Sequence, residues 1–124
     1  MKTLVVTAFP TIAKQLNSML ASLGFHGTET ATDSDAALTK IGTGTFSLVL
    51  CDWLLEPESG LDLLGRVRAD ARTTDLLFVL MFAESSDEKI ERTRLSGAIG
   101  HLVKPFDIAA VNAAIAGART MANA

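Results

Sequence analysis

The sequence predicts one α/β domain built as a three-layer sandwich, in which a parallel sheet of five strands lies between two layers of helices. Strand-like apolar runs alternate with helix-like stretches along the 124 residues, and two of those runs are apolar at nearly every position. Strands of that kind are covered on both faces, which favours a parallel sheet. Short connections and right-handed crossovers then place helices on both sides of the sheet.

Five apolar runs are the candidate strands. The clear runs are residues 4–6, 46–51, 76–82 and 102–103, and a weaker run lies around residues 25–30. The runs at 46–51 and 76–82 contain almost no polar residue, so we expect them at the buried centre of the sheet.

Apolar residues at helical spacing place a helix after the first run and another after the weak one. Ile12, Leu16 and Leu20 lie on one face of the first helix, and Gly24 stands where a helix stop is expected. The second helix begins at residues 32–34, where three side chains offer capping oxygens, and ends near residues 42–44.

Three further helices follow the remaining runs. One begins after Gly60. The next is capped by Ser85 or Ser86, and the acidic residues that follow suit the positive end of the helix dipole. The last is capped by Asp107 and runs towards Arg119. We expect a single domain over residues 1–124, with residues 120–124 as a frayed tail.

Composition and charge argue against several classes of protein. The formal net charge is -3 and the 11 Lys and Arg residues are scattered, whereas a nucleic-acid footprint needs clustered basic residues. The single cysteine, Cys51, cannot form an internal disulfide, and the sequence shows no signal peptide. No apolar run approaches the ~18 to 20 residues that cross a bilayer. We expect a cytoplasmic chain without nucleic-acid or membrane partners.

Asp52 and Lys104 stand out among the residues just past the predicted strands. Ligands bind a parallel α/β sheet at the carboxyl ends of its strands, near the point where the strand order reverses. Asp52 follows an apolar run and is poorly solvated there, and Lys104 follows a neighbouring strand within reach of it. Such a pair is worth ~4 kcal/mol of Coulomb attraction at an effective dielectric near 20, before desolvation is subtracted. The plain alternative is a turn-starting aspartate and a surface lysine.

The sequence offers no other catalytic pattern. It has no glycine-rich phosphate loop, no Cys or His pair at metal-ligand spacing, and no nucleophilic constellation of serine with histidine. We therefore expect a chain that is not an enzyme.

Three segments carry a resemblance to a known family. They are Cys51-Asp52-Trp53, Gly60-Leu61-Asp62-Leu63-Leu64 and Lys104-Pro105-Phe106. In these segments, and over essentially its whole length, the chain resembles the CheY-like receiver domain of bacterial response regulators. The resemblance implies a flavodoxin-like fold with strand order 2-1-3-4-5.

The resemblance also implies roles in a two-component phosphorelay. Asp52 matches the phosphoacceptor, a carboxylate that takes a phosphoryl group from a histidine kinase or a small phosphodonor. Lys104 matches the lysine that contacts the phosphoryl oxygens, and its bond to Pro105 is expected to be cis. Partners, either the histidine kinase or a downstream target, are expected at the face made by the fourth helix, fifth strand and fifth helix. Candidate residues on that face are Lys89, Arg92, Arg94 and His101.

The chain departs from the family's pattern at the metal ligands. Receivers carry an acidic pair after the first strand, and this sequence has Thr7 and Ala8 there. Only Asp52 is left to hold Mg2+, a cation that is usually bound by carboxylates together with waters and phosphate. Glu56 and Glu84 lie in loops at the same edge, and together with Thr7 they are the candidates for substitute ligands.

Two switch positions also differ, and they leave two functions open. The hydroxyl residue that reads the phosphoryl group falls at Phe82, and the aromatic residue of the fifth strand is His101. The first function is an atypical stand-alone receiver, a monomer or weak dimer, with impaired Mg2+ binding and phosphorylation, which works through protein–protein interaction. The alternative is a functional phosphoacceptor, phosphorylated on Asp52 by a histidine kinase with Mg2+ as cofactor. A third class, a small-molecule-binding flavodoxin-like domain, has little support because the sequence lacks a phosphate loop.

Overall fold

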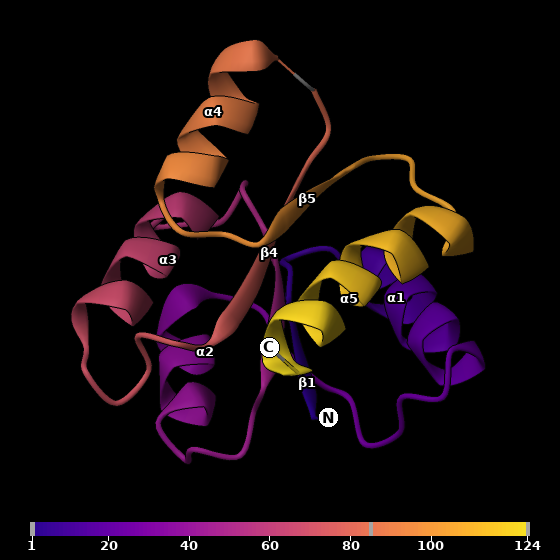
Figure 1. The fold of residues 1–124 in the computed structure, drawn as a ribbon, viewed down its shortest axis with the longest axis horizontal. Coiled ribbons are helices and arrows are strands. Elements are labelled where there is room, and N and C mark those ends of the chain that lie inside the picture. The colour runs from indigo at the N-terminus through magenta and orange to yellow at the C-terminus, as the bar shows by residue number, and fades with distance from the viewer. Residues whose placement is uncertain (1, 85, 124) are drawn as a thin grey trace.

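The computed structural model of the chain describes residues 2–84 and 86–123, with the side chains of residues 2–84 and 86–116. Its strands are β1 (Thr3–Val6), β2 (Glu29–Ala31), β3 (Leu48–Asp52), β4 (Leu77–Phe82) and β5 (Gly100–Val103). They form one parallel sheet in the order β2-β1-β3-β4-β5 (Figure 1). The predicted fold class and the strand order implied by the family resemblance are both confirmed.

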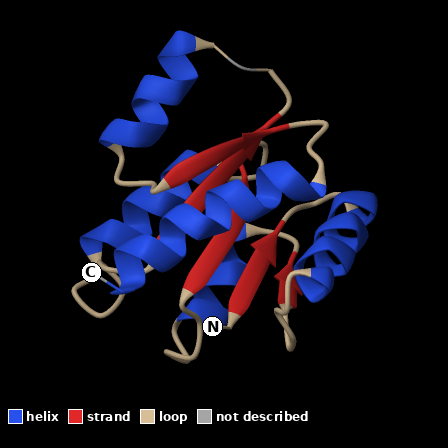
Figure 2. Cartoon of the chain, turned by 45° about the vertical axis from the view of Figure 1, so that its right-hand side comes forward, coloured by secondary structure: helices blue, strands red, loops and turns tan. Residues whose placement is uncertain are grey.

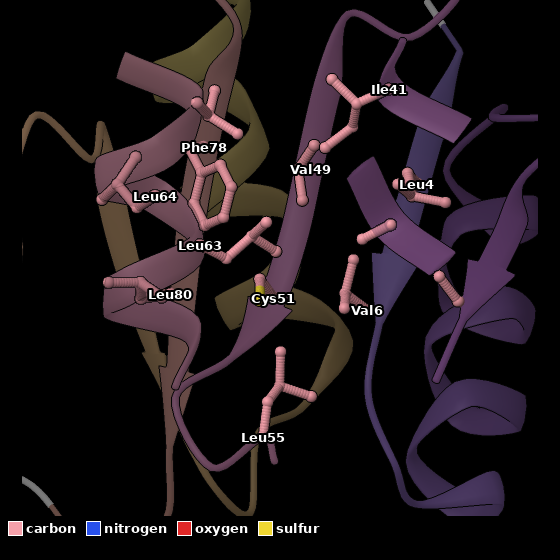
Figure 3. Packing of buried hydrophobic residues seen from close by; sticks show 13 residues of the cluster. Leu4, Val6, Ile41, Val49, Cys51, Leu55, Leu63, Leu64, Phe78 and Leu80 are labelled. Carbon is pink, nitrogen blue, oxygen red and sulfur yellow. The ribbon is translucent and has the colours of Figure 1, made fainter. Parts of the chain in front are cut away.

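Helices cover both faces of this sheet (Figure 2). They are α1 (Pro10–Ser22), α2 (Ser34–Ile41), α3 (Gly60–Ala69), α4 (Asp87–Leu95) and α5 (Ile108–Asn123). Buried residues of α1 and α5 pack against one face in a cluster with Val5, Leu50 and Met81 of the central strands. Buried residues of α2 and α3 pack against the other face, where Phe78 of β4 lies among Leu63 and Leu64 of α3 (Figure 3). In the described part of the chain, no helix is both long and apolar enough to span a membrane.

The helix α4 is attached to the sheet in a different way. Its one buried residue among those described is Thr93, and it supplies none of the buried residues of the two hydrophobic clusters. Leu95 at its last position is 70% exposed. Apolar burial therefore contributes little to holding α4, which lies beside β5 at one end of the sheet in Figure 1.

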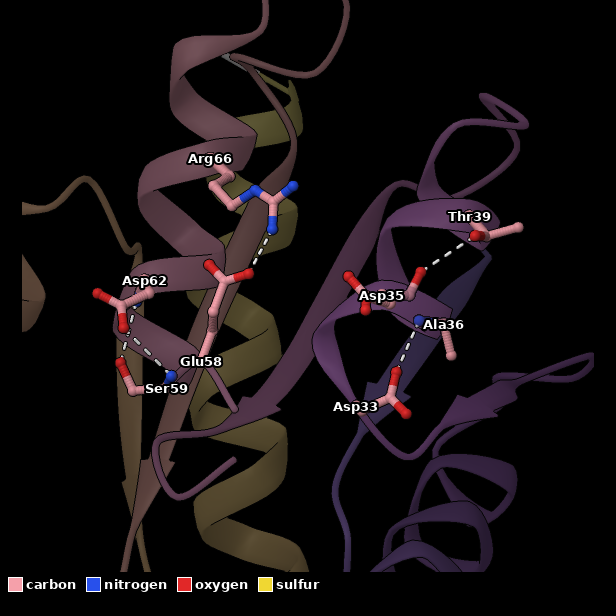
Figure 4. Close-up of polar contacts among 8 residues, drawn as sticks. All are labelled: Asp33, Asp35, Ala36, Thr39, Glu58, Ser59, Asp62 and Arg66. Carbon is pink, nitrogen blue, oxygen red and sulfur yellow. Dashed lines mark hydrogen bonds and ion pairs between the residues drawn. The ribbon is translucent and has the colours of Figure 1, made fainter. Parts of the chain in front are cut away.

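Side-chain caps fix where several helices begin. Asp33 caps α2 by accepting the Ala36 N–H at 2.8 Å, and Ser59 forms a reciprocal capping box with Asp62 at the start of α3 (Figure 4). Asp107 accepts the Ala110 N–H at 2.9 Å, as the sequence predicted. Of the two serines proposed for α4, Ser86 is the cap.

Several element boundaries differ from the sequence-based expectation, and β1, β4 and β5 begin at Thr3, Leu77 and Gly100 and not at residues 4, 76 and 102. β3 begins at Leu48 and not at residue 46. The weak strand lies at Glu29–Ala31, because the backbone of Phe25 instead closes α1 through a hydrogen bond to the Leu20 carbonyl. α5 continues past Arg119 to Asn123, since no helix breaker follows that arginine. The frayed tail expected at residues 120–124 stays a prediction, and Ala124 lies outside the described residues.

Gly60 is placed against the backbone of the strand that precedes it. A Cβ atom at this position would lie 2.1 Å from the Asp52 carbonyl oxygen, which is backbone and cannot easily move away. Gly65 lies on the same helix, and a Cβ there would meet nothing within 4 Å. The first turn of α3 therefore approaches β3 closely only because residue 60 has no side chain.

We predict that Gly60→Ala lowers the free energy of unfolding by about 2 to 3 kcal/mol, as expected of overpacking at a site that cannot relax. The control, Gly65→Ala, is expected to raise it by about 0.5 to 1 kcal/mol, because alanine is the better helix former. Urea unfolding of both variants measures these changes. Equal effects of the two substitutions would show that the contact with Asp52 is not a constraint.

Candidate functional site

Strand register brings Thr7 and Asp52 together at the carboxyl edge of the sheet. Val6 of β1 pairs with Cys51 of β3, so the residues that follow them, Thr7 and Asp52, lie next to each other. Asp52 is the last residue of β3, not the first residue after it as the sequence suggested, and its side chain is fully buried. The chain order reverses between β1 and β3, which is where ligand sites form in such sheets.

Lys104 reaches Asp52 from a strand that is not its neighbour. β4 lies between β3 and β5, and the Lys104 side chain passes over the end of β4. Its Nζ lies 2.5 Å from Asp52 Oδ1, and only 16% of its side chain is exposed. The two atoms form an ion pair, but their geometry is not that of a hydrogen bond. Asp52 Oδ1 therefore accepts no hydrogen bond from the described residues. The Lys104–Pro105 bond is cis, as the family resemblance implied.

Thr7 fixes the other oxygen of the same carboxylate. Its hydroxyl donates to Asp52 Oδ2 at 2.7 Å and accepts the Phe9 N–H at 3.1 Å. Thr7 is 3% exposed, so water does not compete for these bonds. An isolated buried carboxylate is costly, and here the charge is balanced by Lys104 and oriented by Thr7.

An aromatic layer lies on the opposite face of the sheet edge. Side chains alternate between faces along a strand. Asp52, Met81 and Leu102 are paired across β3, β4 and β5 and share one face of the sheet. The aromatic residues each lie one position away from these three and belong to the other face: Trp53, Phe82 and His101. The rings of Trp53 and Phe82 meet edge to face, with centroids 5.9 Å apart. Phe82 is stacked on His101 at 5.6 Å and 8°. The two predicted switch positions are thus in direct ring contact.

Cations from α4 and from the β5–α5 loop lie over these and neighbouring rings. Lys89 Nζ is 6.0 Å from the Trp53 ring and 5.8 Å from the Phe82 ring, and the Arg92 guanidinium is 5.6 Å from Trp53. Lys104 Nζ is 5.1 Å from the ring of Phe9. Contacts of this kind contribute roughly 0.5 to 2 kcal/mol each, depending on their exposure. They link α4 to the site, together with a hydrogen bond from Lys89 Nζ to the Glu84 carbonyl oxygen at 3.3 Å.

A cleft of about 270 Å³ opens above Asp52 and Lys104. Glu84 lines this cleft, together with the aromatic side chains of Phe9, Trp53 and Phe82. Glu56 does not, because it lines a separate recess of about 250 Å³ beside Thr32. Of the candidate metal ligands, the structure therefore places Thr7 on Asp52, Glu84 at the cleft and Glu56 outside it. Within the described residues, no three His, Cys, Asp or Glu side chains gather as a possible metal site.

Cys51 is a buried free thiol next to Asp52. Burial raises the pKa of its thiol well above the ordinary value, and the negative charge of Asp52 raises it further. The protonated thiol donates to the Asp52 carbonyl oxygen at 3.3 Å. A thiol in this environment is a poor nucleophile.

The sequence-predicted surface residues fall into two groups. Lys89 and Arg92 lie over Trp53, whereas Arg94 is paired with Glu91 of its own helix at 2.5 Å. Sequence reasoning missed Phe9, whose ring covers the Lys104 ammonium. The available signal was an aromatic residue placed directly before the proline that begins α1, at the same sheet edge as Lys104.

Comparisons with known proteins agree with one another. The family model described as the response regulator receiver domain matches residues 3–116. The chemotaxis protein CheY-3 of Vibrio cholerae is 36% identical over 109 residues, which is 88% of this chain and 84% of that protein. The chemotaxis protein CheY of Pseudomonas aeruginosa is 36% identical over 106 residues, 86% of each chain. Among solved structures, the chemotaxis response regulator CheY4 of Vibrio cholerae superposes with a TM-score of 0.86 at 26% identity, covering 94% of this chain and 97% of that one.

The hydrogen bond from Thr7 to Asp52 yields a prediction. Thr7→Val keeps the shape of the side chain but removes the donor to Oδ2, so we expect a loss of about 1 to 3 kcal/mol in the free energy of unfolding. Thr7→Ser keeps the hydroxyl, so its cost is the smaller loss of one methyl group, about 0.5 to 1.5 kcal/mol. Denaturant unfolding at pH 7 compares the two. A larger loss in the serine variant would show that Thr7 acts by packing alone.

Proposed function

The chain belongs to the response regulator receiver domain family, and from that premise we propose that it is an atypical receiver, which acts by binding protein partners and not as an enzyme. As a receiver domain it belongs to two-component signalling. The observation that carries the proposal is the state of Asp52. The carboxylate matching the phosphoacceptor is fully buried, and its two oxygens are engaged by Lys104 and Thr7.

The donor set around Asp52 fits Mg2+ poorly. Mg2+ demands near-octahedral oxygen ligands at about 2.0 to 2.1 Å and is usually bound through one or two carboxylates. The site offers one carboxylate, and the Lys104 ammonium lies 2.5 Å from one of its oxygens. A dication approaching Oδ1 is repelled by that ammonium, and the Thr7 hydroxyl supplies no charge to offset the repulsion. The ion pair takes the place of the metal ion in balancing Asp52.

Phosphoryl transfer to Asp52 is slow in this proposal. Catalysis of that reaction depends almost entirely on positioning and on charge stabilisation of the transferred group. Lys104 is the one cation in ion-pair contact with Asp52 among the described residues. Phe82 offers no hydroxyl to the phosphoryl oxygens, and its ring is stacked on His101. We expect phosphorylation slowed by orders of magnitude relative to a receiver with a complete site.

One observation favours the alternative, a working phosphoacceptor. Asp52 and Lys104 both line the cleft, so a small phosphodonor or a kinase histidine would meet the carboxylate there if the Lys104 side chain moved aside. In that case Mg2+ would be the cofactor, with Glu84 as the carboxylate nearest to a suitable position and Thr7 as a neutral ligand. The experiment below decides between the two functions.

Partners are proposed on the face made by α4, β5 and α5, by analogy with the family. A kinase or a downstream target of the signalling pathway would bind there, with the chain as a cytoplasmic monomer or weak dimer. In support, β5 is an edge strand, and a recess of about 500 Å³ lies between it and α5, lined by His101 and small residues of the helix.

The test is a titration followed by Trp53, the single tryptophan of the chain, which lines the cleft. We expect no saturable fluorescence change with millimolar Mg2+, and no phosphoryl adduct by intact mass spectrometry after incubation with Mg2+ and acetyl phosphate. The variant Thr7→Asp/Ala8→Asp, which restores an acidic pair after β1, is expected to respond to Mg2+ and shows that the assay detects the metal. An adduct on the wild-type chain that Asp52→Asn removes would establish the alternative.

A further inference from the structure

The cleft above Asp52 has an exposed apolar rim. Among the described residues, four large apolar side chains are counted as exposed, and two of them, Phe9 at 42% and Leu54 at 64%, line this cleft. Trp53, Phe82 and Ala83 complete its apolar lining. Apolar side chains that are exposed together around a concave site indicate an interaction surface, whereas single scattered ones do not.

The size of the cleft indicates what enters it. Its volume of about 270 Å³ is below the ~300 to 1,000 Å³ range of typical small-molecule sites. Space of this size suits one bulky side chain presented by another protein better than a free organic ligand. The bottom of the cleft is closed by the Asp52–Lys104 pair, whose charges already balance each other.

Two cations beside the cleft lack a carboxylate partner. Among the basic side chains of the described residues, six form ion pairs with carboxylates: Lys2, Lys40, Arg66, Arg72, Arg94 and Lys104. Arg68 instead donates to the backbone carbonyls of Thr74 and Gly97, and Lys14 on α1 forms no ion pair among the described residues. Lys89 and Arg92 form none among the described residues, and both are held over aromatic rings at the cleft. Lys89 and Glu84 both line the cleft, where Lys89 Nζ donates to the Glu84 backbone carbonyl at 3.3 Å, and Arg92 lies beside the cleft over the Trp53 ring. Because the rings already restrict both side chains, little further ordering is needed to bind an anion.

From this arrangement we propose that the cleft is the docking site for an acidic protein segment, which inserts one bulky apolar side chain beside Trp53 and places carboxylates on Lys89 and Arg92. The occupant is a peptide segment of a partner protein. The proposal rests on the proposed function as a binding module, and it adds a contact surface at the carboxyl edge of the sheet, separate from the recess between β5 and α5.

The experiment selects peptides from a random library displayed on phage, with the intact chain as bait. We expect enriched peptides to share a bulky apolar residue flanked by Asp or Glu, and the corresponding synthetic peptides to shift Trp53 fluorescence with saturation. Enrichment of basic peptides, an absence of enriched sequences, or binding that leaves Trp53 fluorescence unchanged would each overturn the proposal.

Matched variants locate the site. Lys89→Gln/Arg92→Gln is expected to weaken the selected peptides about tenfold, the sum of two exposed charge contacts. Lys14→Gln is the control, because Lys14 is an exposed lysine of α1 without an ion pair among the described residues, and it should leave affinity unchanged. Leu54→Ser removes one of the two exposed apolar side chains of the rim without touching the core, and it is also expected to weaken binding. Equal affinity in all three variants would overturn the proposal.

The outcomes separate this proposal from the proposed function. Phosphorylation of wild-type Asp52 in the Mg2+ experiment would overturn the proposed function as an atypical receiver, whether or not the selected peptides bind. If the selected peptides bind the Lys89→Gln/Arg92→Gln variant with the same affinity as the wild type, the docking proposal is overturned. The proposed function as an atypical receiver is then unaffected.

Discussion

A fully buried carboxylate is the constraint on which the arrangement of this domain's functional edge depends. Asp52 lies at the end of the central strand β3, and its charge must be balanced where water does not reach it. Lys104 supplies the opposite charge and Thr7 supplies an oriented hydroxyl. The surrounding backbone is packed tightly around Asp52. The Trp53 N–H donates to the Met81 carbonyl at 2.7 Å, and Gly60 packs against the Asp52 carbonyl. The ion pair and the loops around it therefore form one unit.

Strand alternation gives this edge two different sides. The polar side holds Asp52, Thr7 and Lys104, and the aromatic side holds Trp53, Phe82 and His101. α4 is attached to the aromatic side by cations over rings more than by buried apolar residues. An element with few buried apolar contacts is drawn from the less stable part of a fold, so α4 is the helix best placed to change position when the cleft is occupied.

Periodicity and turn chemistry were sufficient to predict the fold class, whereas the strand order came from the family resemblance. Local residue preferences account for the strands covered on both faces and for the helix caps at Asp107 and Ser86. They also account for the helix stop at Gly24, which has φ 91°. The Asp52–Lys104 pair was predicted, although Lys104 reaches across β4 and not from a neighbouring strand. The ring contacts of Phe9 and Lys89 were not predicted, because they depend on where loops lie in three dimensions. Charged residues at strand ends were visible in the sequence, whereas the aromatic residues that surround them gave no periodic signal.

The most direct test of the account is a double-mutant cycle on the Asp52–Lys104 pair. Asp52→Asn, Lys104→Met and the double variant would be compared with the wild type by urea unfolding without added metal. A standing ion pair predicts a coupling energy of about 2 kcal/mol, with Lys104→Met alone the most destabilised because it leaves a buried unpaired carboxylate. Additive effects, with a coupling energy near zero, would contradict the account, because the two groups would then not be balancing each other in the folded domain.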